Sequence, residues 1–128
     1  MIKTGSNSQF LGPQSGYSIV KDRVYAYSGS QTLTGGEFRT QLEFSTGKDP
    51  LDVDFQWSNT ETNSTRDVYV DIMFNGQIVF RGRWENPNIV EKGANPVRLI
   101  IPPYTFVQAL QKNDGTTSGC FLMSGVVV

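Results

Sequence analysis

Three aspartates lie close together in the chain, and carboxylates at their spacing could do two kinds of chemistry. Asp52 and Asp54 fall two residues apart in a run that alternates polar and apolar residues, which would place them roughly 7 Å apart on one strand face, a separation that suits paired carboxylates in a glycosidase. With Asp49 they also suggest a calcium loop, but Pro50 interrupts the group and the glycine and closing glutamate of an EF-hand are missing. Because the alternation turns Asp52 and Asp54 outward, we interpret them as a solvated or interface face, and we predict no metal site.

The other groups that support catalysis are scarce. Histidine is absent, which removes the commonest general base and the usual activator of a nucleophile. Cys120 stands alone in an apolar run, so it has no intrachain disulfide partner, and we interpret it as a small buried side chain. Gly35-Gly36 and the glycines of 115–119 lack the lysine of a P-loop and the spacing of a dinucleotide site. We therefore predict no catalytic residues, no cofactor and no enzymatic activity.

Length and composition favour one all-β domain. The chain has 128 residues, enough for one sizeable core. Val, Ile, Phe, Tyr and Trp together number 34 against 10 Ala and Leu, a composition that favours pleated, half-buried surfaces over helices. A net charge of −1 provides no basic field for nucleic acid. No run of about 18 apolar residues could span a membrane and no apolar leader follows Met1, so we expect a soluble chain made in the cytoplasm.

Alternation along the chain predicts eight to nine strands at spacings near ten residues. The clearest run is 51–57, and others fall within 17–27, 38–44, 97–101, 105–111 and 121–128, whereas 28–36 is predicted to be a loop. We expect a two-sheet antiparallel β-sandwich over residues 16–128, jelly-roll-like, with an immunoglobulin-like sandwich as the alternative. Residues 1–15 are mostly small and polar, and we expect a flexible N-terminal arm whose Phe10 and Leu11 could dock on a neighbour. In the strand of 38–44, the expected buried side chains are Phe38, Leu42 and Phe44, with Arg39, Gln41 and Glu43 opposite.

The segment 67–84 is a β-hairpin with an informative register. Val68, Val70 and Ile72 alternate with polar residues before Asn75-Gly76. A simple two-residue connection would put arginines opposite these apolar residues, because side chains change face at every position. We therefore expect a loop of odd parity, for example Phe74-Asn75-Gly76 as a type I turn with a left-handed Gly76 in a G1 bulge. The buried side chains of the second strand would then be Ile78 and Phe80.

The same parity identifies a candidate contact surface. Tyr69 and Asp71 fall on the outward face of the hairpin, and Arg81 and Arg83 join them there, a mixture of aromatic and charged side chains typical of protein interfaces. Trp57 and Trp84 have the apolar parity of their strands, so we predict that they are core residues rather than a sugar-stacking platform. We expect Trp57→Ala to unfold the protein and Arg81→Ala to leave folding intact while weakening partner binding.

The second half of the chain resembles a known family. The parts concerned are the hairpin, the segment Val97-Arg98-Leu99-Ile100-Ile101-Pro102-Pro103-Tyr104-Thr105, the short strand and polar turn that follow it, and the closing run 120–126. Together they are similar to the C-terminal end of small head decoration (cement) proteins of tailed bacteriophages. The resemblance implies a β-sandwich, often trimeric, that sits on the outer capsid surface and braces the major capsid protein.

Two classes of function are therefore expected. The first is a non-enzymatic virion structural protein, made in the host cytoplasm, that binds the major capsid protein and forms a homo-oligomer, with a trimer favoured. The alternative is a carbohydrate-binding module or a receptor-binding piece of a phage tail. Exposed aromatic rings over a concave sheet would favour the sugar-binding alternative, and covered tryptophans would favour the capsid.

Overall fold

Strands account for almost all regular structure in the computed structural model, which describes residues 2–4, 14–60, 67–84 and 96–128. No helix in these segments is long and apolar enough to cross a membrane. The strands in these segments are β1 (Ile2–Thr4), β2 (Gln14–Ser15), β3 (Ser18–Val20), β4 (Arg23–Tyr27), β5 (Gln31–Leu33), β6 (Arg39–Ser45), β7 (Leu51–Asn59), β8 (Val68–Phe74), β9 (Gln77–Trp84), β10 (Val97–Ile101), β11 (Phe106–Asn113) and β12 (Thr117–Val127).

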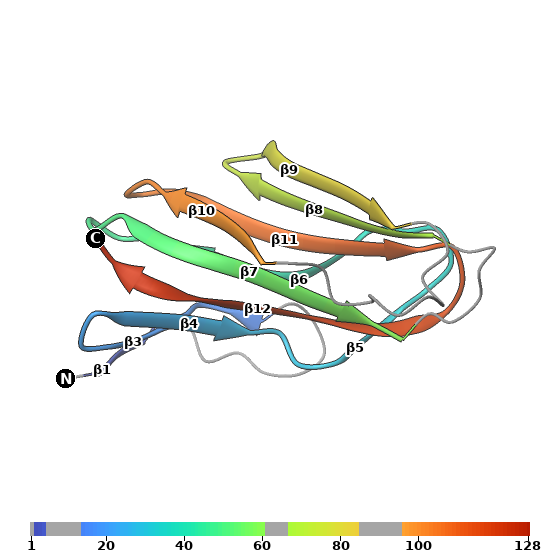
Figure 1. Ribbon diagram of the computed structural model, residues 1–128, viewed down its shortest axis with the longest axis horizontal. Coiled ribbons are helices and arrows are strands. Elements are labelled where there is room, and N and C mark those ends of the chain that lie inside the picture. The colour runs from blue at the N-terminus through green and yellow to red at the C-terminus, as the bar shows by residue number, and fades with distance from the viewer. Residues whose placement is uncertain (1, 5–13, 61–66, 85–95) are drawn as a thin grey trace.

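The strands form two sheets that pack face to face (Figure 1). The first sheet has the order β1-β3-β4-β12-β7-β10, with β5 also paired to β12, and the second has the order β2-β6-β11-β8-β9. All the pairs are antiparallel apart from the short β2–β6 pair. The central strands β4-β12-β7-β10 and β6-β11-β8-β9 follow the strand order of a two-sheet jelly roll. The predicted all-β sandwich is confirmed, with the jelly-roll arrangement rather than the immunoglobulin-like one.

The core lies between the inward faces of the two sheets. In β7, Leu51, Val53, Phe55 and Trp57 are all buried while the residues between them face outward, as the alternation predicts. The indole of Trp57 packs against Phe121, at 5.6 Å between ring centroids. The prediction that Trp57 is a core residue is confirmed, whereas the side chain of Trp84 lies outside the described residues.

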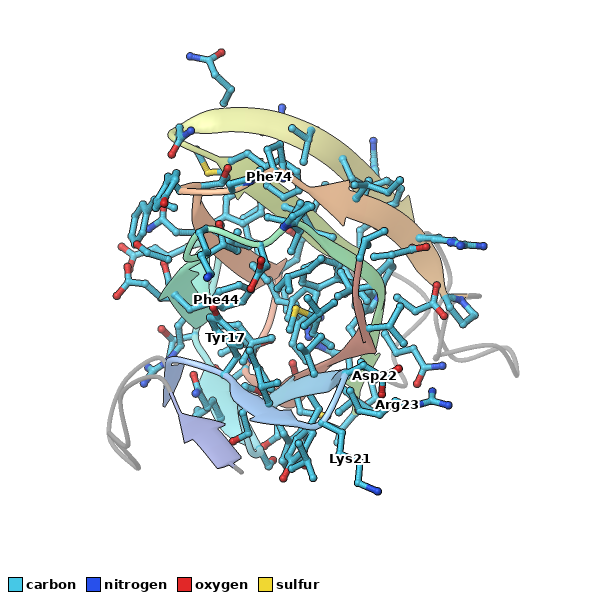
Figure 2. The ribbon with its side chains drawn as sticks, turned by 90° about the vertical axis from the view of Figure 1, so that its left-hand side faces the viewer. Tyr17, Lys21, Asp22, Arg23, Phe44 and Phe74 are labelled. Carbon is cyan, nitrogen blue, oxygen red and sulfur yellow. The ribbon has the colours of Figure 1, made fainter. Side chains whose placement is uncertain are left out.

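One end of the sandwich is closed by aromatic side chains. Tyr17 and Phe44 meet edge to face, with ring centroids 5.2 Å apart, and Phe74 is partly buried against the same core. Figure 2 shows this end, with Tyr17 and Phe44 next to each other below Phe74. The side chains of the Lys21–Arg23 turn lie apart from them. Packed aromatic rings therefore cover the core at this end.

The apolar residues of the two strands of the β8–β9 hairpin share a face, as predicted, but the loop differs from the predicted one. Val70 pairs with Gly82 and Ile72 with Phe80, so the apolar residues share a face. The loop, however, is only Asn75-Gly76, both with positive φ (51° and 80°), the signs typical of a type I′ turn. A bulge between Ile72 and Met73 in the register with β9 then restores the odd parity. The predicted three-residue loop was wrong.

The same bulge corrects the predicted side-chain set of β9. Ile78 pairs with Met73, so it lies on the outward face and is 46% exposed rather than buried with Phe80. A bulge changes which residues face the core from that point onward. The predicted burial of Ile78 was therefore wrong.

A second irregularity changes the face of Gln41 in β6. The register of β6 with β11 shifts between Ala109 and Leu110, so that Ala109 pairs with Leu42 and Leu110 with Thr40. Gln41 and Leu42 are consequently both fully buried, and the prediction that Gln41 faces outward was wrong. Phe38, predicted to be buried, is 38% exposed.

The segment 28–36 contains a strand that the sequence pattern did not predict. Gln31–Leu33 forms β5 and pairs with residues 117–119 of β12. Leu33 is fully buried, and the amide of Gln31 donates to the carbonyl of Ser28 at 3.2 Å. A three-residue strand with one apolar side chain gives too short an alternation to distinguish it from a Ser/Thr/Gly loop.

The apolar C-terminal run is paired inside the first sheet. Val126 pairs with Asp52 and Val127 with Leu51 of β7, while the other side of β12 is covered by β4. This run is therefore not an exposed sheet edge, and covering it does not require a second chain.

Candidate protein-contact surface

Outward side chains of the second sheet form a row that crosses its central strands near the end opposite the β8–β9 turn. Lys112 of β11 pairs with Tyr69 of β8, and Tyr69 pairs with Arg83 of β9. Phe38, just before β6, completes the row beyond Lys112. Cross-strand pairs lie close enough for side chains to interact. We call these four residues the cation–aromatic row.

Cations and aromatic rings alternate along this row. The Lys112 ammonium nitrogen lies 4.3 Å from the centre of the Tyr69 ring and 5.2 Å from that of Phe38. The Arg83 guanidinium carbon lies 5.5 Å from the Tyr69 ring. All three distances are within the range of cation–π attraction. The row therefore holds Tyr69 between two cations.

Next to the row, ion pairs cover carboxylates and leave guanidinium groups exposed. Arg81 donates from Nε to Asp71 Oδ1 and from Nη2 to Asp71 Oδ2, both at 2.8 Å. The Asp71 side chain is only 7% exposed, while that of Arg81 is 61% exposed. The hydrogen bonds from Arg81 to Asp71 raise the pKa of the guanidinium. Arg83 donates from Nε and Nη2 to one oxygen of Asp67, Oδ2, at 3.0 and 2.6 Å, and the Asp67 side chain is 16% exposed.

The groups exposed to solvent beside the row therefore carry more positive charge than the count of acidic and basic residues there indicates. The acidic groups beside the two arginines, Asp67 and Asp71, lie beneath the arginines that they pair with, whereas Arg81 and Arg83 project outward. Exposed arginine beside tyrosine is the mixture enriched at protein interfaces. This surface suits a protein partner with acidic groups.

The structure brings together the four residues predicted on the hairpin. Tyr69, Asp71, Arg81 and Arg83 share the outward face, with Asp71 buried beneath Arg81 and thus placed to support the surface rather than to contact a partner directly. The other two predicted contact residues, Phe10 and Leu11, lie outside the described residues.

Two residues of the row were missed by sequence reasoning. Outward parity in 105–111 could have been extended to Lys112, but the pairing of β11 with β8 joins segments about 40 residues apart in sequence. Phe38 was assigned to the core because the bulge at Gln41 is not visible in the polar and apolar pattern.

The buried carboxylate changes the expected result for Arg81. We expect Arg81→Ala to lower the free energy of unfolding, because Asp71 would remain buried without its two donors. The double variant Asp71→Ala, Arg81→Ala should recover part of this loss. Urea denaturation of both variants measures the effect, and unchanged stability of the single variant would show that the pair contributes nothing to folding.

The carboxylates that could have formed a glycosidase pair lie on the outer face of the first sheet. Asp52 accepts a hydrogen bond from Arg98 Nε at 2.8 Å, which lowers the pKa of Asp52. Asp54 is exposed on the same strand. Within the described segments, no three acidic, cysteine or histidine side chains gather as potential metal ligands.

The lowered pKa of Asp52 predicts a dependence of stability on pH. The unfolded carboxyl titrates near pH 3.9, so the stabilisation from the Arg98 pair is present above about pH 3.9 and is lost as pH falls through the lower folded value. Asp52→Asn should therefore melt below wild type at neutral pH and approach it in strong acid. Thermal melts across that range measure the difference, and a constant gap would contradict the pairing.

Cys120 does not have the predicted burial. It is half-buried on the outer face of the first sheet, where its sulfur lies 3.0 Å from the hydroxyl oxygen of Ser58. The neighbouring thiol raises the pKa of Tyr27, which is 54% exposed. The apolar neighbours of Cys120 in sequence belong to the opposite face of β12, since Phe121 is fully buried.

Comparison with known proteins gives distant similarity in structure alone. No protein-family model matches the chain, and no curated protein matches it. A crystal structure of the infectious bursal disease virus VP2 subviral particle is similar over 95% of this chain, with a TM-score of 0.48 and 11% sequence identity. A structure of the Gx strain of the same virus gives the same values. The chain spans 38% and 37% of the length of those two chains.

Proposed function

We propose that this chain is a non-enzymatic virion structural protein that decorates and stabilises a tailed-phage capsid by binding the major capsid protein. The observation that carries the proposal is the outward face of the second sheet, where Arg81 and Arg83 project above the largely covered carboxylates of Asp71 and Asp67 in and beside the cation–aromatic row. Such a face suits attachment to another protein and needs no chemistry of its own. The resemblance of the second half of the chain to phage decoration proteins supports the choice of a capsid as the partner.

The fold also suits a protein that holds neighbouring capsid subunits together. Two sheets with an aromatic and aliphatic core form a rigid body, and a rigid body loses little conformational entropy when it binds. We place the protein on the outer capsid surface after synthesis in the host cytoplasm. The proposed homo-oligomer, a trimer by preference, rests on the family resemblance, because the C-terminal run is already covered within the sheet.

Co-sedimentation with assembled heads that lack this chain tests the proposal. We expect wild type to pellet with the heads and Lys112→Glu to bind at least tenfold more weakly, because the substitution reverses a charge in the cation–aromatic row. Lys21→Glu makes the same charge change at the exposed β3–β4 turn of the first sheet (Figure 2). The row lies on the second sheet, so this variant should bind like wild type. Raising the salt concentration should weaken binding of wild type.

Each result has a definite meaning. Wild type that stays in the supernatant would overturn the proposed function. Normal binding of Lys112→Glu would agree with a capsid partner but would show that this face does not contact the capsid. Light scattering of the free protein tests the trimer separately, and a monomer that still binds heads would contradict the trimer alone.

A second candidate is a carbohydrate-binding module or receptor-binding piece of a tail. Tyr25 and Tyr27 lie two residues apart on the outward face of β4 and are 48% and 54% exposed. Exposed rings on one strand face could stack on sugars. If this candidate is correct, wild type will pellet with insoluble polysaccharide and not with heads, and the variant Tyr25→Ala, Tyr27→Ala will abolish that binding.

A further inference from the structure

The outward face of the second sheet carries four apolar side chains on three neighbouring strands. Ile78 of β9 pairs with Met73 of β8, and Met73 pairs with Gln108 of β11. Phe106 and Leu110 lie two residues to either side of Gln108, so they share its outward face. Both are therefore diagonal to Met73, at a separation that long side chains can span. We call Met73, Ile78, Phe106 and Leu110 the Met73 patch.

The Met73 patch is open to solvent. Ile78 is 46% exposed and Phe106 is 38% exposed, while Met73 and Leu110 are half-buried. The outward face of an antiparallel sheet normally carries polar side chains. Single exposed apolar residues are common on proteins, but adjoining ones mark interaction sites.

The β-bulge in β9 places Ile78 and Arg81 on the same face. They are three residues apart, and residues at an odd separation in a regular strand point to opposite faces. Val79 is the extra residue between the pairing positions of Ile78 and Phe80, and it is 42% exposed. Bulges re-aim side chains and are frequent next to functional sites. Here the bulge joins an apolar patch to an exposed cation on one surface.

Charges of both signs border the patch. Arg81 lies on one side, paired with the covered carboxylate of Asp71. On the other side, Glu43 of β6 is half-buried and accepts a hydrogen bond from Gln108 Nε2 at 3.2 Å. An apolar centre with a charged rim is the usual anatomy of a protein interface. The carboxylate of Glu43 makes the same surface less suited to nucleic acid or to an anionic membrane.

The spacing of these groups matches an extended segment. Arg81 and Ile78 lie opposite Asp71 and Met73, which are two residues apart in β8, a separation of about 7 Å. Side chains two residues apart on an extended partner segment have the same separation. The two bonds from Arg81 to Asp71 use Nε and Nη2, and neither uses Nη1. A guanidinium has five N–H donors, so Arg81 can serve a second carboxylate.

We propose that the Met73 patch is the apolar centre of the capsid contact and takes an extended segment of the partner, in which an apolar and an acidic residue stand two positions apart. The apolar side chain lies on Met73 and Ile78, and the carboxylate reaches Arg81. The inference rests on the proposed function and specifies the chemistry of its partner. Within the contact, the patch supplies affinity by burying apolar area, and the cation–aromatic row supplies orientation.

Binding of Ile78→Thr to heads that lack this chain tests the patch. Threonine keeps a β-branched side chain, which suits a strand, and we expect co-sedimentation with the heads to weaken by about fivefold or more. Ile100→Thr is the matched control, because Ile100 is 63% exposed on β10, the edge strand of the first sheet. The control should bind and melt like wild type. Met73→Gln, a change between side chains of similar length, is the second test and should weaken binding as well.

Salt and carboxylate chemistry test the two parts of the proposed segment. Raising sodium chloride from about 0.1 to 0.5 M screens charges, so it should leave the loss caused by Ile78→Thr unchanged and reduce the loss caused by Lys112→Glu. A loss for Ile78→Thr that disappears in high salt would contradict an apolar centre. Converting the surface carboxylates of the heads to amides should weaken wild-type binding by about tenfold or more. Equal binding to treated and untreated heads would contradict the acidic residue.

The outcomes distinguish this inference from the function on which it rests. Wild type that does not pellet would overturn the proposed function. Wild type that pellets no better than both Ile78→Thr and Met73→Gln would overturn the patch and leave capsid binding intact. Melting of both variants well below Ile100→Thr would show that the patch supports the fold and would also overturn the inference. Pelleting of wild type with phosphatidylserine vesicles, lost in Ile78→Thr while head binding is unchanged, would assign the patch to a membrane instead.

Discussion

Gln111→Leu should lower the free energy of unfolding by about 3 kcal/mol or more, because it leaves several buried polar groups without partners. The Gln111 side chain is fully buried between the sheets. Its Nε2 donates to Gln41 Oε1 at 2.8 Å and to the carbonyl oxygens of Ser58 and Cys120 at 3.2 and 3.1 Å. Its Oε1 accepts from Asn59 at 3.2 Å. One amide thus joins β6, β7, β11 and β12.

A glycine makes room for this amide. A Cβ at Gly119 would lie 2.9 Å from Gln111 Oε1 and 3.1 Å from the carbonyl oxygen of Ser58, too close for the present packing. Gln41 also donates to the carbonyl of Gly119, at 3.0 Å. The network therefore depends on one close backbone approach and on two glutamines from the opposite sheet.

Urea denaturation of Gln111→Leu measures the effect, with Gln108→Leu as the matched control. Gln108 lies on the outward side of the same strand and is half-buried, where it donates to Glu43 at 3.2 Å. We expect the control to change the free energy of unfolding by less than about 1 kcal/mol. Equal stability of Gln111→Leu and wild type would show that leucine replaces the network without loss.

Trp57→Ala should destabilise the protein by about 3–5 kcal/mol. Trp57 is 4% exposed, and its ring centroid lies 5.7 Å from that of Phe80 and 5.6 Å from that of Phe121. It therefore joins β7 to the opposite sheet and to its own neighbour β12. Removing it would leave a cavity that these rings cannot fill without moving.

Thermal and urea unfolding measure the Trp57 effect, with Tyr25→Ala as the control for loss of an exposed ring. We expect the control to unfold within about 0.5 kcal/mol of wild type. A stable and soluble Trp57→Ala protein that no longer bound its partner would reverse the assignment and make Trp57 a contact residue.

The sequence predicted those parts of the fold in which one alternation runs without interruption. The four inward residues of β7 have the predicted burial, and the parity of the hairpin brings Tyr69, Arg81 and Arg83 to one face. In both cases a local pattern is sufficient, because side chains change face at every residue of a strand.

The parts that were wrong depend on bulges. Gln41 and Ile78 were each assigned to the wrong face, and both follow from a register shift in a neighbouring pair of strands. A bulge inserts one residue into one strand and is fixed by the partner strand, which the local pattern does not include. The buried polar network has the same origin, because Gln111 meets its partners across the two sheets.

The candidate contact surface could also be predicted only where its contacts are local in sequence. Arg81 and Asp71 are directly opposite in a local hairpin, so their proximity could be predicted, but the burial of Asp71 could not. Lys112 joins Tyr69 only through the pairing of β11 with β8. The β10–β11 turn is held by hydrogen bonds to two other turns, and nothing in the local sequence indicates the positive φ of Tyr104.

Electron cryomicroscopy of heads that lack this chain, before and after the purified protein is added, tests capsid decoration most directly. We predict added density on the outer surface, at the joints between major capsid subunits, into which the two-sheet sandwich fits with the cation–aromatic row against a capsid subunit. Heads that remain unchanged at saturating protein would contradict the account.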